Sequence, residues 1–375
     1  MSFTGPPSQG VFTKIDPLGL NDTVSVAAER MWRFELPAVP VVDGEGRYAG
    51  IVSIFSLLRT RYQAGTKLGS VLEKAPVVEP SLPLTEVARM LVKTGQPGLA
   101  VVEGGRVVGI VSARRLLAGM GLSSRVTARH IAYRLDPLAP SDPLEKARKL
   151  IVDLGLRLVP VAEDGKAVGV VRVYDLVNFV YNTPLRRERL GEVKGETSYF
   201  LEQPVAKIAT ANFRTVHVDG YPSVEDIAEG SVVVDSSGKV YGIISPYLLL
   251  RRLLPAIEEA KVPLRVEGVD ELDFIQRNLI YRKSLDIASE VSRRARLLEM
   301  SVVLKSREKS GNRRRYDAIV SIKLDVDSYS ARSSGWDAVE TVYEALDSAY
   351  KVFSKSKEKK REKRISLARL RKILE

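Results

Sequence analysis

The sequence predicts a mixed α/β and α+β protein, in which four copies of one strand–helix–strand–strand–helix unit precede a different domain with a basic C-terminal helix. The first observation is the stretch GIVSIFSLL from residue 50, which returns as GIVSARRLL from 109, GVVRVYDLV from 169 and GIISPYLLL from 242. The first three copies begin 59 and 60 residues apart, and a fixed period is typical of a repeated structural unit. The second observation is that the pattern ends near residue 255, where the chain becomes strongly basic.

Each copy is predicted to contain two helices around a β-hairpin. A capping residue precedes apolar positions at helical spacing in NDTVSVAAERMW, PSLPLTEVARMLV and PSDPLEKARKLIV, which predicts the first helix. Two apolar runs joined by a turn, such as Asp43-Gly44 or Gly104-Gly105, predict the hairpin. The recurring stretch is the second hairpin strand, and it continues into the second helix.

This unit, with its period near 60 and its VPVVD-turn-GIVS hairpin, resembles the CBS domain, and four copies resemble two paired CBS modules. We expect the first pair in residues 1–125 and the second in 126–260, with a charged, turn-rich connector at about 181–203. The fourth copy is expected to be degenerate, because its first helix, PSVEDIAEG, is short and runs directly into the next strand. Homodimers formed through the CBS modules are a further expectation of this resemblance.

The resemblance also implies a nucleotide site. Nucleotide-binding CBS copies follow the last strand with Ser or Thr near phosphate and, three residues later, an Asp that accepts hydrogen bonds from ribose hydroxyls. Ser53, Ser112 and Ser245 lack that Asp, whereas copy three has Asp175 but carries Arg172 in place of the hydroxyl. Arg172 and Asp175 are therefore the candidate nucleotide-binding residues, with an adenine nucleotide as ligand. The alternative is that Asp175 only caps its helix.

The C-terminal domain, residues 261–375, is predicted to have the order β-α-β-β-β-α, with two helices on one face of a four-stranded sheet. A short strand precedes an amphipathic helix at about 272–296. Alternating apolar positions predict strands in LLEMSVVLKSREK and RRRYDAIVSIKLDV, followed by SYSARSSG and a Lys-rich helix. This order, with ARSSGWDAVETVYEALDSAYK before the Lys-rich end, resembles the ribosome hibernation-promoting-factor family. CBS repeats joined to such a domain resemble archaeal factors that silence both ribosomal subunits.

Positive charge is concentrated in this domain. Residues 1–260 hold 31 Lys and Arg against 28 Asp and Glu, whereas residues 261–375 hold 27 against 18. Because phosphates attract Lys and Arg regardless of sequence, three basic segments in one fold predict a surface for structured RNA. Two alternatives stay open, namely solvated surface charge and nonspecific binding of DNA. The candidate RNA-binding residues are Arg277, Arg282, Lys283, Arg293, Arg294, Lys305, Arg307, Arg313, Arg314, Arg315, Lys351, Lys355, Lys357, Lys359, Lys360, Arg361, Lys363 and Arg364.

The motifs give no support for catalysis, since the chain has no cysteine, only two histidines, and neither a Gly-rich phosphate loop nor a nucleophile elbow. We therefore expect a protein that is not an enzyme and requires no cofactor. We also expect it to be cytoplasmic and to bind no membrane, because no apolar run approaches the ~18 residues of a membrane span. The resemblance implies a translational silencer that occludes the messenger and transfer RNA path of the small subunit, with rRNA and ribosomal proteins as partners. The CBS repeats would then either contact the ribosome, including its large subunit, or sense nucleotide. The alternative function is an adenine-nucleotide sensor that regulates a protein partner.

Overall fold

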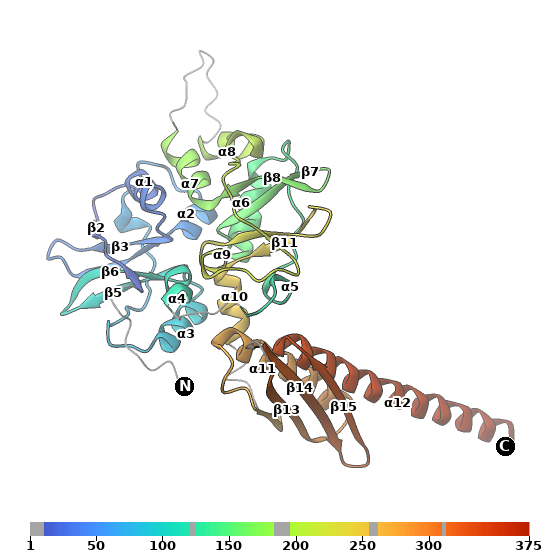
Figure 1. The fold of residues 1–375 in the computed structure, drawn as a ribbon. Helices are drawn as coiled ribbons and strands as arrows, with labels where there is room; N and C mark the ends of the chain where they lie inside the picture. The colour runs from blue at the N-terminus through green and yellow to red at the C-terminus, as the bar shows by residue number, and fades with distance from the viewer. Residues whose placement is uncertain (1–10, 120–124, 184–195, 255–261, 310–312, 375) are drawn as a thin grey trace. The chain divides into compact units, whose positions relative to one another are not determined.

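The computed structural model describes residues 11–119, 125–183, 196–254, 262–309 and 313–374, without the side chains of residues 196, 197, 309, 313, 357 and 359–374. Its contacts divide the chain into two compact units, Met1–Arg251 and Arg252–Glu375. The first unit contains the four predicted repeats, and the second contains the basic domain (Figure 1).

Repeats 1 and 2 follow the predicted order of helices and strands. Their first strand is much shorter than the others, with two residues in repeat 1 and a single bridge from Val78 to Val101 in repeat 2. Repeat 1 comprises β2 (Leu18–Gly19), α1 (Val24–Phe34), β3 (Ala38–Val42), β4 (Tyr48–Ser53) and α2 (Ile54–Thr60). Repeat 2 comprises α3 (Leu84–Thr94), β5 (Gly98–Glu103), β6 (Arg106–Ser112) and α4 (Ala113–Gly119), with β1 (Phe12–Thr13) and η1 (Leu68–Ser70) beside the pair.

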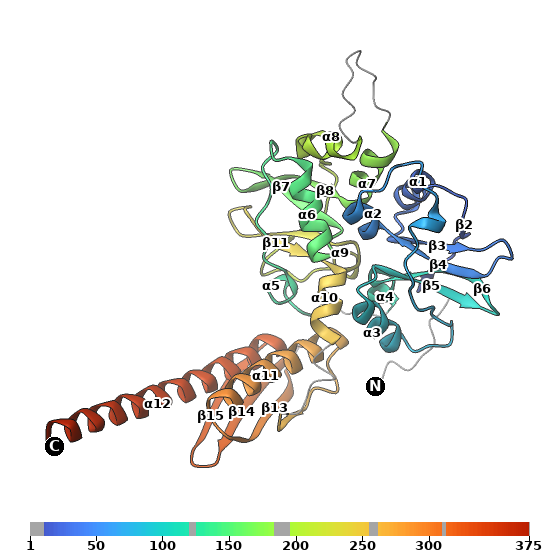
Figure 2. The same ribbon diagram turned by 180° about the vertical axis from the view of Figure 1, so that it is seen from behind.

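Repeats 3 and 4 form the second half of this unit (Figures 1 and 2). Repeat 3 comprises α6 (Leu144–Leu154), β7 (Leu158–Glu163), β8 (Lys166–Arg172) and α7 (Val173–Asn182). Repeat 4 comprises β9 (Thr215–His217), α9 (Val224–Glu229), β10 (Ser231–Val234), β11 (Val240–Ile244) and α10 (Pro246–Leu253). The short helices α5 (Ala128–Ile131), α8 (Glu196–Glu202) and η2 (Val205–Lys207) complete it. As predicted, the first helix of repeat 4 is short, with six residues against 11 in repeats 1 to 3.

The segment predicted as a connector at about 181–203 ends in a short helix, which its charged and turn-rich composition did not indicate. Its residues 184–195 lie outside the described part of the chain, but α8 follows directly. Phe200 and Leu201 of α8 are buried, and the Phe200 ring meets the Phe179 ring of α7 edge-on with centroids 5.1 Å apart. This apolar contact explains the helix, because tertiary packing of an apolar face stabilises short helices more than propensity does.

Each recurring stretch begins with glycine because a neighbouring backbone crosses it. A methyl group on Gly109 would lie 2.5 Å from the Thr13 carbonyl oxygen, and one on Gly50 would lie 2.9 Å from that of Glu73. The segment before repeat 1 thus crosses the hairpin of repeat 2, and the segment before repeat 2 crosses that of repeat 1. Thr210 and Tyr133 make the same exchange across Gly169 and Gly242. This reciprocal exchange pairs repeat 1 with 2 and repeat 3 with 4.

The two pairs pack against each other through helices. Helix α1 contacts α7, α2 contacts α6 and α7, and α4 contacts α9. Met31 and Leu57 of repeat 1 consequently share one buried core with Leu176 and Val180 of repeat 3. These helix faces therefore pack against each other within one chain. A homodimer formed through the CBS modules stays a prediction.

The second unit has the predicted order β-α-β-β-β-α. Its elements are β12 (Leu264–Glu267), α11 (Phe274–Arg294), β13 (Leu297–Lys309), β14 (Arg313–Leu324), β15 (Ser328–Gly335) and α12 (Ala338–Leu374). The sheet order is β12-β13-β14-β15, with β12 parallel to β13 and the other neighbours antiparallel. Helix α11 begins at a capping box formed by Asp273 and Gln276, a pattern typical of helix N-termini.

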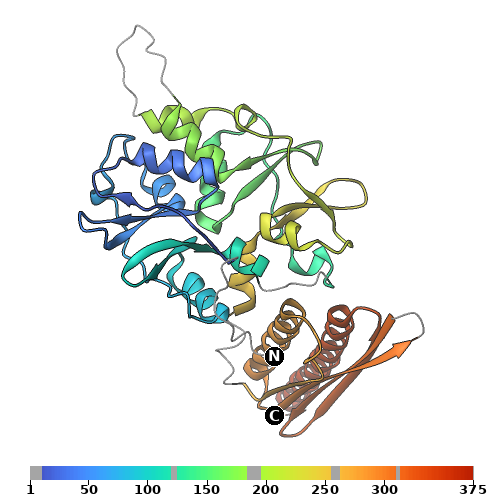
Figure 3. The same cartoon turned by 60° about the vertical axis from the view of Figure 1, so that its left-hand side comes forward.

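Helices α11 and α12 lie on the same face of this sheet (Figures 1 and 3). Val302 of β13 and Val320 of β14 are fully buried there with Leu279 of α11 and Leu346 of α12. Successive strand residues point to opposite faces, so the odd-numbered residues of β13 and β14 point to the other face of the sheet. No described element of this unit covers that other face.

Candidate functional site

The serines that end three of the hairpins cap the following helices. The Oγ atom of Ser53 accepts a hydrogen bond from the Ser56 amide at 3.1 Å, and Ser112 and Ser245 accept from amides three residues on at 3.4 and 3.5 Å. A capping hydroxyl satisfies an amide that has no partner inside the helix. These serines therefore have a structural role that requires no nucleotide.

In repeat 1 a carboxylate of the chain itself is hydrogen-bonded to the serine hydroxyl. The Ser53 hydroxyl donates to Glu73 Oε1 at 2.7 Å, and Gln96 Nε2 donates to Glu73 Oε2 at 3.1 Å. Burial acts to raise the pKa of Glu73, but hydrogen bonds from Ser53, Ser56 and Gln96 outweigh it and lower that pKa. Glu73 therefore stays ionised and repels an anion from this hydroxyl.

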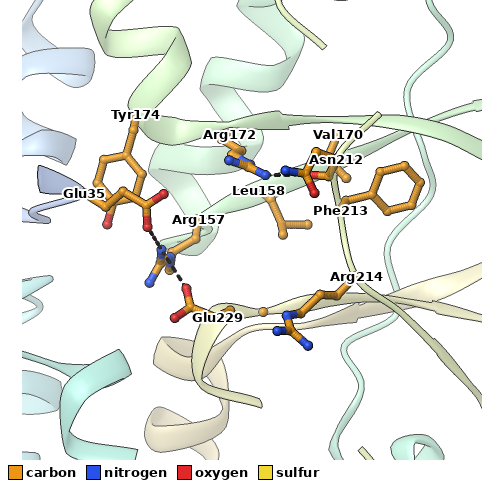
Figure 4. A pocket seen from close by; sticks show the side chains of 11 residues that line it. Glu35, Arg157, Leu158, Val170, Arg172, Tyr174, Asn212, Phe213, Arg214 and Glu229 are labelled. Carbon is orange, nitrogen blue, oxygen red and sulfur yellow. Dashed lines mark hydrogen bonds and ion pairs between the residues drawn. The ribbon is translucent and has the colours of Figure 1, made fainter. Parts of the chain in front are cut away.

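A cavity of about 160 Å³ lies between repeats 3 and 4 (Figure 4). Arg157, Arg172 and Arg214 bring three guanidinium groups to its wall, and Phe213 and Tyr174 bring aromatic rings. Drug-sized ligands occupy pockets of about 300–1,000 Å³. A whole nucleotide therefore fits only if these side chains move or if part of it protrudes.

The guanidinium groups of this cavity already have acceptors. Arg172 donates to the backbone carbonyl of Asn212, and Arg214 lies 3.3 Å from carboxylate oxygens of both Glu225 and Asp226. Arg157 pairs with the carboxylates of Glu35 in repeat 1 and Glu229 in repeat 4. An incoming phosphate must therefore compete with existing partners for each cation.

The structure separates the roles of the two predicted nucleotide residues. Arg172 lines the cavity, whereas Asp175 does not and instead accepts a hydrogen bond from Trp32 Nε1 of α1 at 3.3 Å. The alternative, that Asp175 caps α7, is wrong, because Arg172 holds the cap position and makes no side-chain capping bond. Burial raises the pKa of Asp175, against the lowering effects of Arg172 and Trp32.

Four charged residues, one from each repeat, form a closed ring of ion pairs at the centre of the first unit. Arg114 lies 3.4 Å from Glu35 and donates to Glu229 at 2.7 Å. Arg157 lies 3.3 Å from Glu35 and 3.6 Å from Glu229, as Figure 4 shows for these three residues. The Arg157 guanidinium also lies 5.3 Å from the centre of the buried Tyr174 ring. The ring links all four repeats through charge.

The predicted RNA-binding residues of α11 are largely paired with local carboxylates. Arg282 lies 3.3 Å from Asp286, and Lys283 lies 2.8 Å from Asp347 of α12. Arg293 and Arg294 both contact Glu290, at 3.3 and 2.7 Å. Arg277 is half-buried and has no ion pair among the described residues. These cations belong to the helix layer of the second unit.

The predicted residues of the β13–β14 hairpin fall into two groups. Arg314 lies 2.7 Å from Glu271 and 3.4 Å from Glu308. Lys305, Arg307 and Arg315 lie on the sheet face opposite the helices, by strand alternation. The sheet therefore separates them from the cations of α11, which corrects the expectation that all three basic segments converge on one ligand.

The remaining predicted residues are described only in part. Lys351 and Lys355 are exposed on α12. The other seven lie in β14 or α12, but their side chains are outside the described part of the structure: Arg313, Lys357, Lys359, Lys360, Arg361, Lys363 and Arg364.

Sequence reasoning missed two groups of residues. Arg332 of β15 lies on the same sheet face as Lys305 and Arg315, and Trp336 directly follows that strand. Alternation in SYSARSSG gave a signal for Arg332 once the strand register is known. The ring of Glu35, Arg114, Arg157 and Glu229 gave no signal, because its members lie in four different repeats.

A comparison with known families matches three segments of the first unit. Residues 13–62, 68–121 and 134–182 match the model of the CBS domain. The chain contains three CBS domains. Repeat 4, with the same order of elements, extends the CBS architecture in the structure. CBS domains suggest a nucleotide-sensing regulatory role. Among the described residues, no group of three or more metal-ligating side chains is assembled, and no helix combines the length and apolarity needed to cross a bilayer.

Several proteins similar to this chain come from archaea. A Thermofilum pendens protein, named as an uncharacterized 33.4 kDa protein in a ribosomal RNA operon, is 26% identical over 253 residues, covering 60% of this chain and 82% of the relative. A Methanocaldococcus jannaschii protein, described as a candidate archaeal homolog of g-AMPK, has a TM-score of 0.51 at 15% identity, covering 64% of this chain and 96% of that chain. A conserved Pyrococcus horikoshii protein has a TM-score of 0.42 at 20% identity, covering 65% and 98%. The Methanocaldococcus structure shares the fold of the CBS unit.

Proposed function

We propose that this protein binds the ribosome and silences translation, through a C-terminal unit related to hibernation-promoting factors that occupies the messenger and transfer RNA path of the small subunit. The observation that carries the proposal is the concentration of charge in that unit, with 27 Lys and Arg against 18 Asp and Glu in residues 261–375. Lys and Arg on a small folded unit suit rRNA, because phosphate contacts supply most of the affinity for a polyanion. Occlusion of the path requires no chemistry.

Two further facts support this proposal. The β-α-β-β-β-α order matches the order expected of the hibernation-promoting-factor family. The Thermofilum relative is named as a product of a ribosomal RNA operon, and co-transcription with rRNA suits a ribosome-binding protein. The CBS unit then acts as a scaffold and offers a second contact surface, which includes a contact with the large subunit. Its serines cap helices and its central arginines pair with glutamates, so these residues serve the fold rather than a nucleotide.

The test is sedimentation of the purified full chain with archaeal 30S and 50S subunits across a salt series. We expect co-sedimentation with 30S at moderate salt and a steep loss of binding as salt rises, because phosphate contacts release condensed counterions from the RNA and this release becomes less favourable at higher salt. Failure to sediment with either subunit at moderate salt contradicts the proposal. Equal affinity for duplex DNA and for rRNA supports nonspecific nucleic-acid binding instead.

A second candidate function rests on the cavity between repeats 3 and 4, whose Arg157, Arg172 and Arg214 suit phosphate. In this account the CBS unit senses an adenine nucleotide and regulates a protein partner. Calorimetry with AMP, ATP and S-adenosylmethionine separates the two accounts. Micromolar binding that is lost in Arg172→Ala, without any binding to subunits, supports the sensor. Subunit binding without nucleotide binding supports the silencer.

A further inference from the structure

The face of the C-terminal sheet opposite α11 and α12 carries a compact group of cations. Strand register places Lys305 opposite Asp317 and Arg307 opposite Arg315 on neighbouring strands, and Arg332 opposite Ile319 on the next pair. All four cations are exposed. We call Lys305, Arg307, Arg315, Arg332 and Trp336 the sheet patch.

The carboxylate of Asp317 interacts electrostatically with several of these cations. Asp317 accepts a hydrogen bond from Ser334 Oγ at 2.5 Å and lies 3.5 Å from Arg307. The Ser334 hydrogen bond first, and then the positive charges of Arg307, Arg315 and Lys305, lower the pKa of Asp317 against the effect of burial. Among the described residues, neither Lys305, Arg315 nor Arg332 forms an ion pair within 4.0 Å. The patch therefore holds excess positive charge.

The cross-strand pair of Arg307 and Arg315 is unfavourable for folding by itself. Like charges directly opposite each other on antiparallel strands destabilise a sheet. Here they lie two register positions from the end of the ladder beside the turn that joins β13 to β14, on the sheet face that no described element of this unit covers. An anionic ligand that lies across the strands removes this repulsion, whereas the paired cations of α11 gain much less from one.

An exposed indole lies one residue beyond the end of β15, the strand that carries Arg332. Trp336 directly follows Gly335, whose register partner Tyr316 is the neighbour of Arg315, and 58% of the Trp336 surface is exposed. Unpaired bases stack on aromatic side chains in proteins that bind single-stranded RNA. Base stacking on an aromatic side chain contributes about 1–3 kcal/mol per base.

We propose that the sheet patch binds an unpaired RNA segment, with phosphates on Lys305, Arg307, Arg315 and Arg332 and one base stacked on Trp336. The inference rests on the proposed function for its ligand, and it assigns the RNA to the sheet face rather than to the helix layer. An acidic protein segment would use the cations but gains nothing from an exposed indole, so a single strand of RNA fits better than a polycarboxylate.

The affinity test uses the full chain and a fluorescein-labelled, unstructured 15-nucleotide RNA, followed by anisotropy across a salt series. The double variant Lys305→Ala and Arg315→Ala should weaken binding about tenfold and flatten the slope of log affinity against log salt by about 1.4, since each single-strand phosphate contact contributes about 0.7. The charge-matched control, Arg33→Ala with Arg47→Ala in repeat 1, should change affinity less than twofold. If Arg282→Ala with Lys283→Ala weakens binding as much as the sheet variant, the RNA lies on the helix layer and the inference is overturned.

Tryptophan fluorescence gives an independent readout, because the chain has two tryptophans, Trp32 and Trp336. In a Trp32→Phe background, the RNA should quench the emission of Trp336, whereas polyglutamate of equal charge should leave that emission unchanged and displace the RNA much less effectively than unlabelled RNA does. Unchanged emission at saturating RNA, or equal competition by polyglutamate, overturns the inference. If the sheet variants still bind RNA and 30S subunits normally, only this inference fails; if the unmodified chain binds neither, the proposed function fails as well.

Discussion

At the scale of single residues, hydrogen-bonding partners decide what the CBS hairpins can bind. Ser53 caps its helix and donates to Glu73, and the candidate nucleotide residue Asp175 accepts from Trp32, so both side chains already have partners within the chain. A nucleotide must compete with these internal partners, as it must with the carbonyl that holds Arg172. The residues of the recurring stretch thus maintain the fold of the repeats first.

Asp175 gives a pH-dependent prediction. Burial raises its folded pKa above the unfolded value, so the folded chain holds this proton more tightly and loses stability as pH rises through the folded pKa. Asp175→Asn cannot ionise and still accepts from Trp32, so we expect it to stabilise the protein by roughly 0.5 kcal/mol at pH 7. Chemical denaturation at pH 7 and at a pH below 3.8, the ordinary value, checks this. A variant less stable than the parent at pH 7 shows that the ionised carboxylate contributes to folding.

At the scale of elements, the exchange of segments between paired repeats explains both the glycines and the pairing. The carbonyl of Thr13 passes so close to Gly109 that a side chain there must displace β1 from β6. The same geometry recurs at each copy of the stretch, which is why all four begin with glycine.

Gly109→Ala should therefore destabilise the CBS unit by about 2–3 kcal/mol, because its methyl group would lie 2.5 Å from the Thr13 oxygen. Thermal unfolding measures the loss. The control is Gly44→Ala in a hairpin turn, where no atom lies within 4 Å of the added methyl, and it should change stability by less than about 0.5 kcal/mol. Equal effects of the two variants would show that backbone crowding is not the reason for the glycine.

The sequence predicts elements well where its pattern is local. The period of the recurring stretch predicts the repeats, and alternation of apolar residues predicts β13, β14 and β15. It does not predict α8, because the apolar residues of that helix follow a highly charged stretch of sequence. It also does not predict which basic segments lie on the same face of the C-terminal sheet. That second question depends on strand register and on which face α11 and α12 cover, and both are set by tertiary packing.

At the scale of the whole molecule, the ring of Glu35, Arg114, Arg157 and Glu229 joins four repeats that are distant in sequence. Each arginine contacts two glutamates, and each glutamate contacts two arginines. Such a network contributes more than isolated surface pairs when its members are partly buried. Because Arg157 lines the cavity and pairs with both glutamates, an anion there must compete with them, which favours the scaffold account of the CBS unit.

A double-mutant cycle of Arg157→Met and Glu229→Gln tests the ring. Their side chains are 17% and 33% exposed, so solvent screens the pair only in part. We expect a coupling of about 0.5–1 kcal/mol in the free energy of unfolding, and a smaller coupling in 1 M salt than in 0.1 M salt. Additive effects at both salt concentrations would mean that the repeats are held together by apolar packing alone.

Occlusion of the messenger RNA path is the central claim, and competition on the small subunit tests it most directly. Archaeal 30S subunits are loaded with a fluorescein-labelled leader messenger RNA, and the full chain is titrated in at moderate salt. The account predicts release of the messenger RNA at one protein per subunit, and weaker release by Lys305→Ala with Arg315→Ala. Sedimentation of messenger RNA and protein together on the same subunits would contradict it.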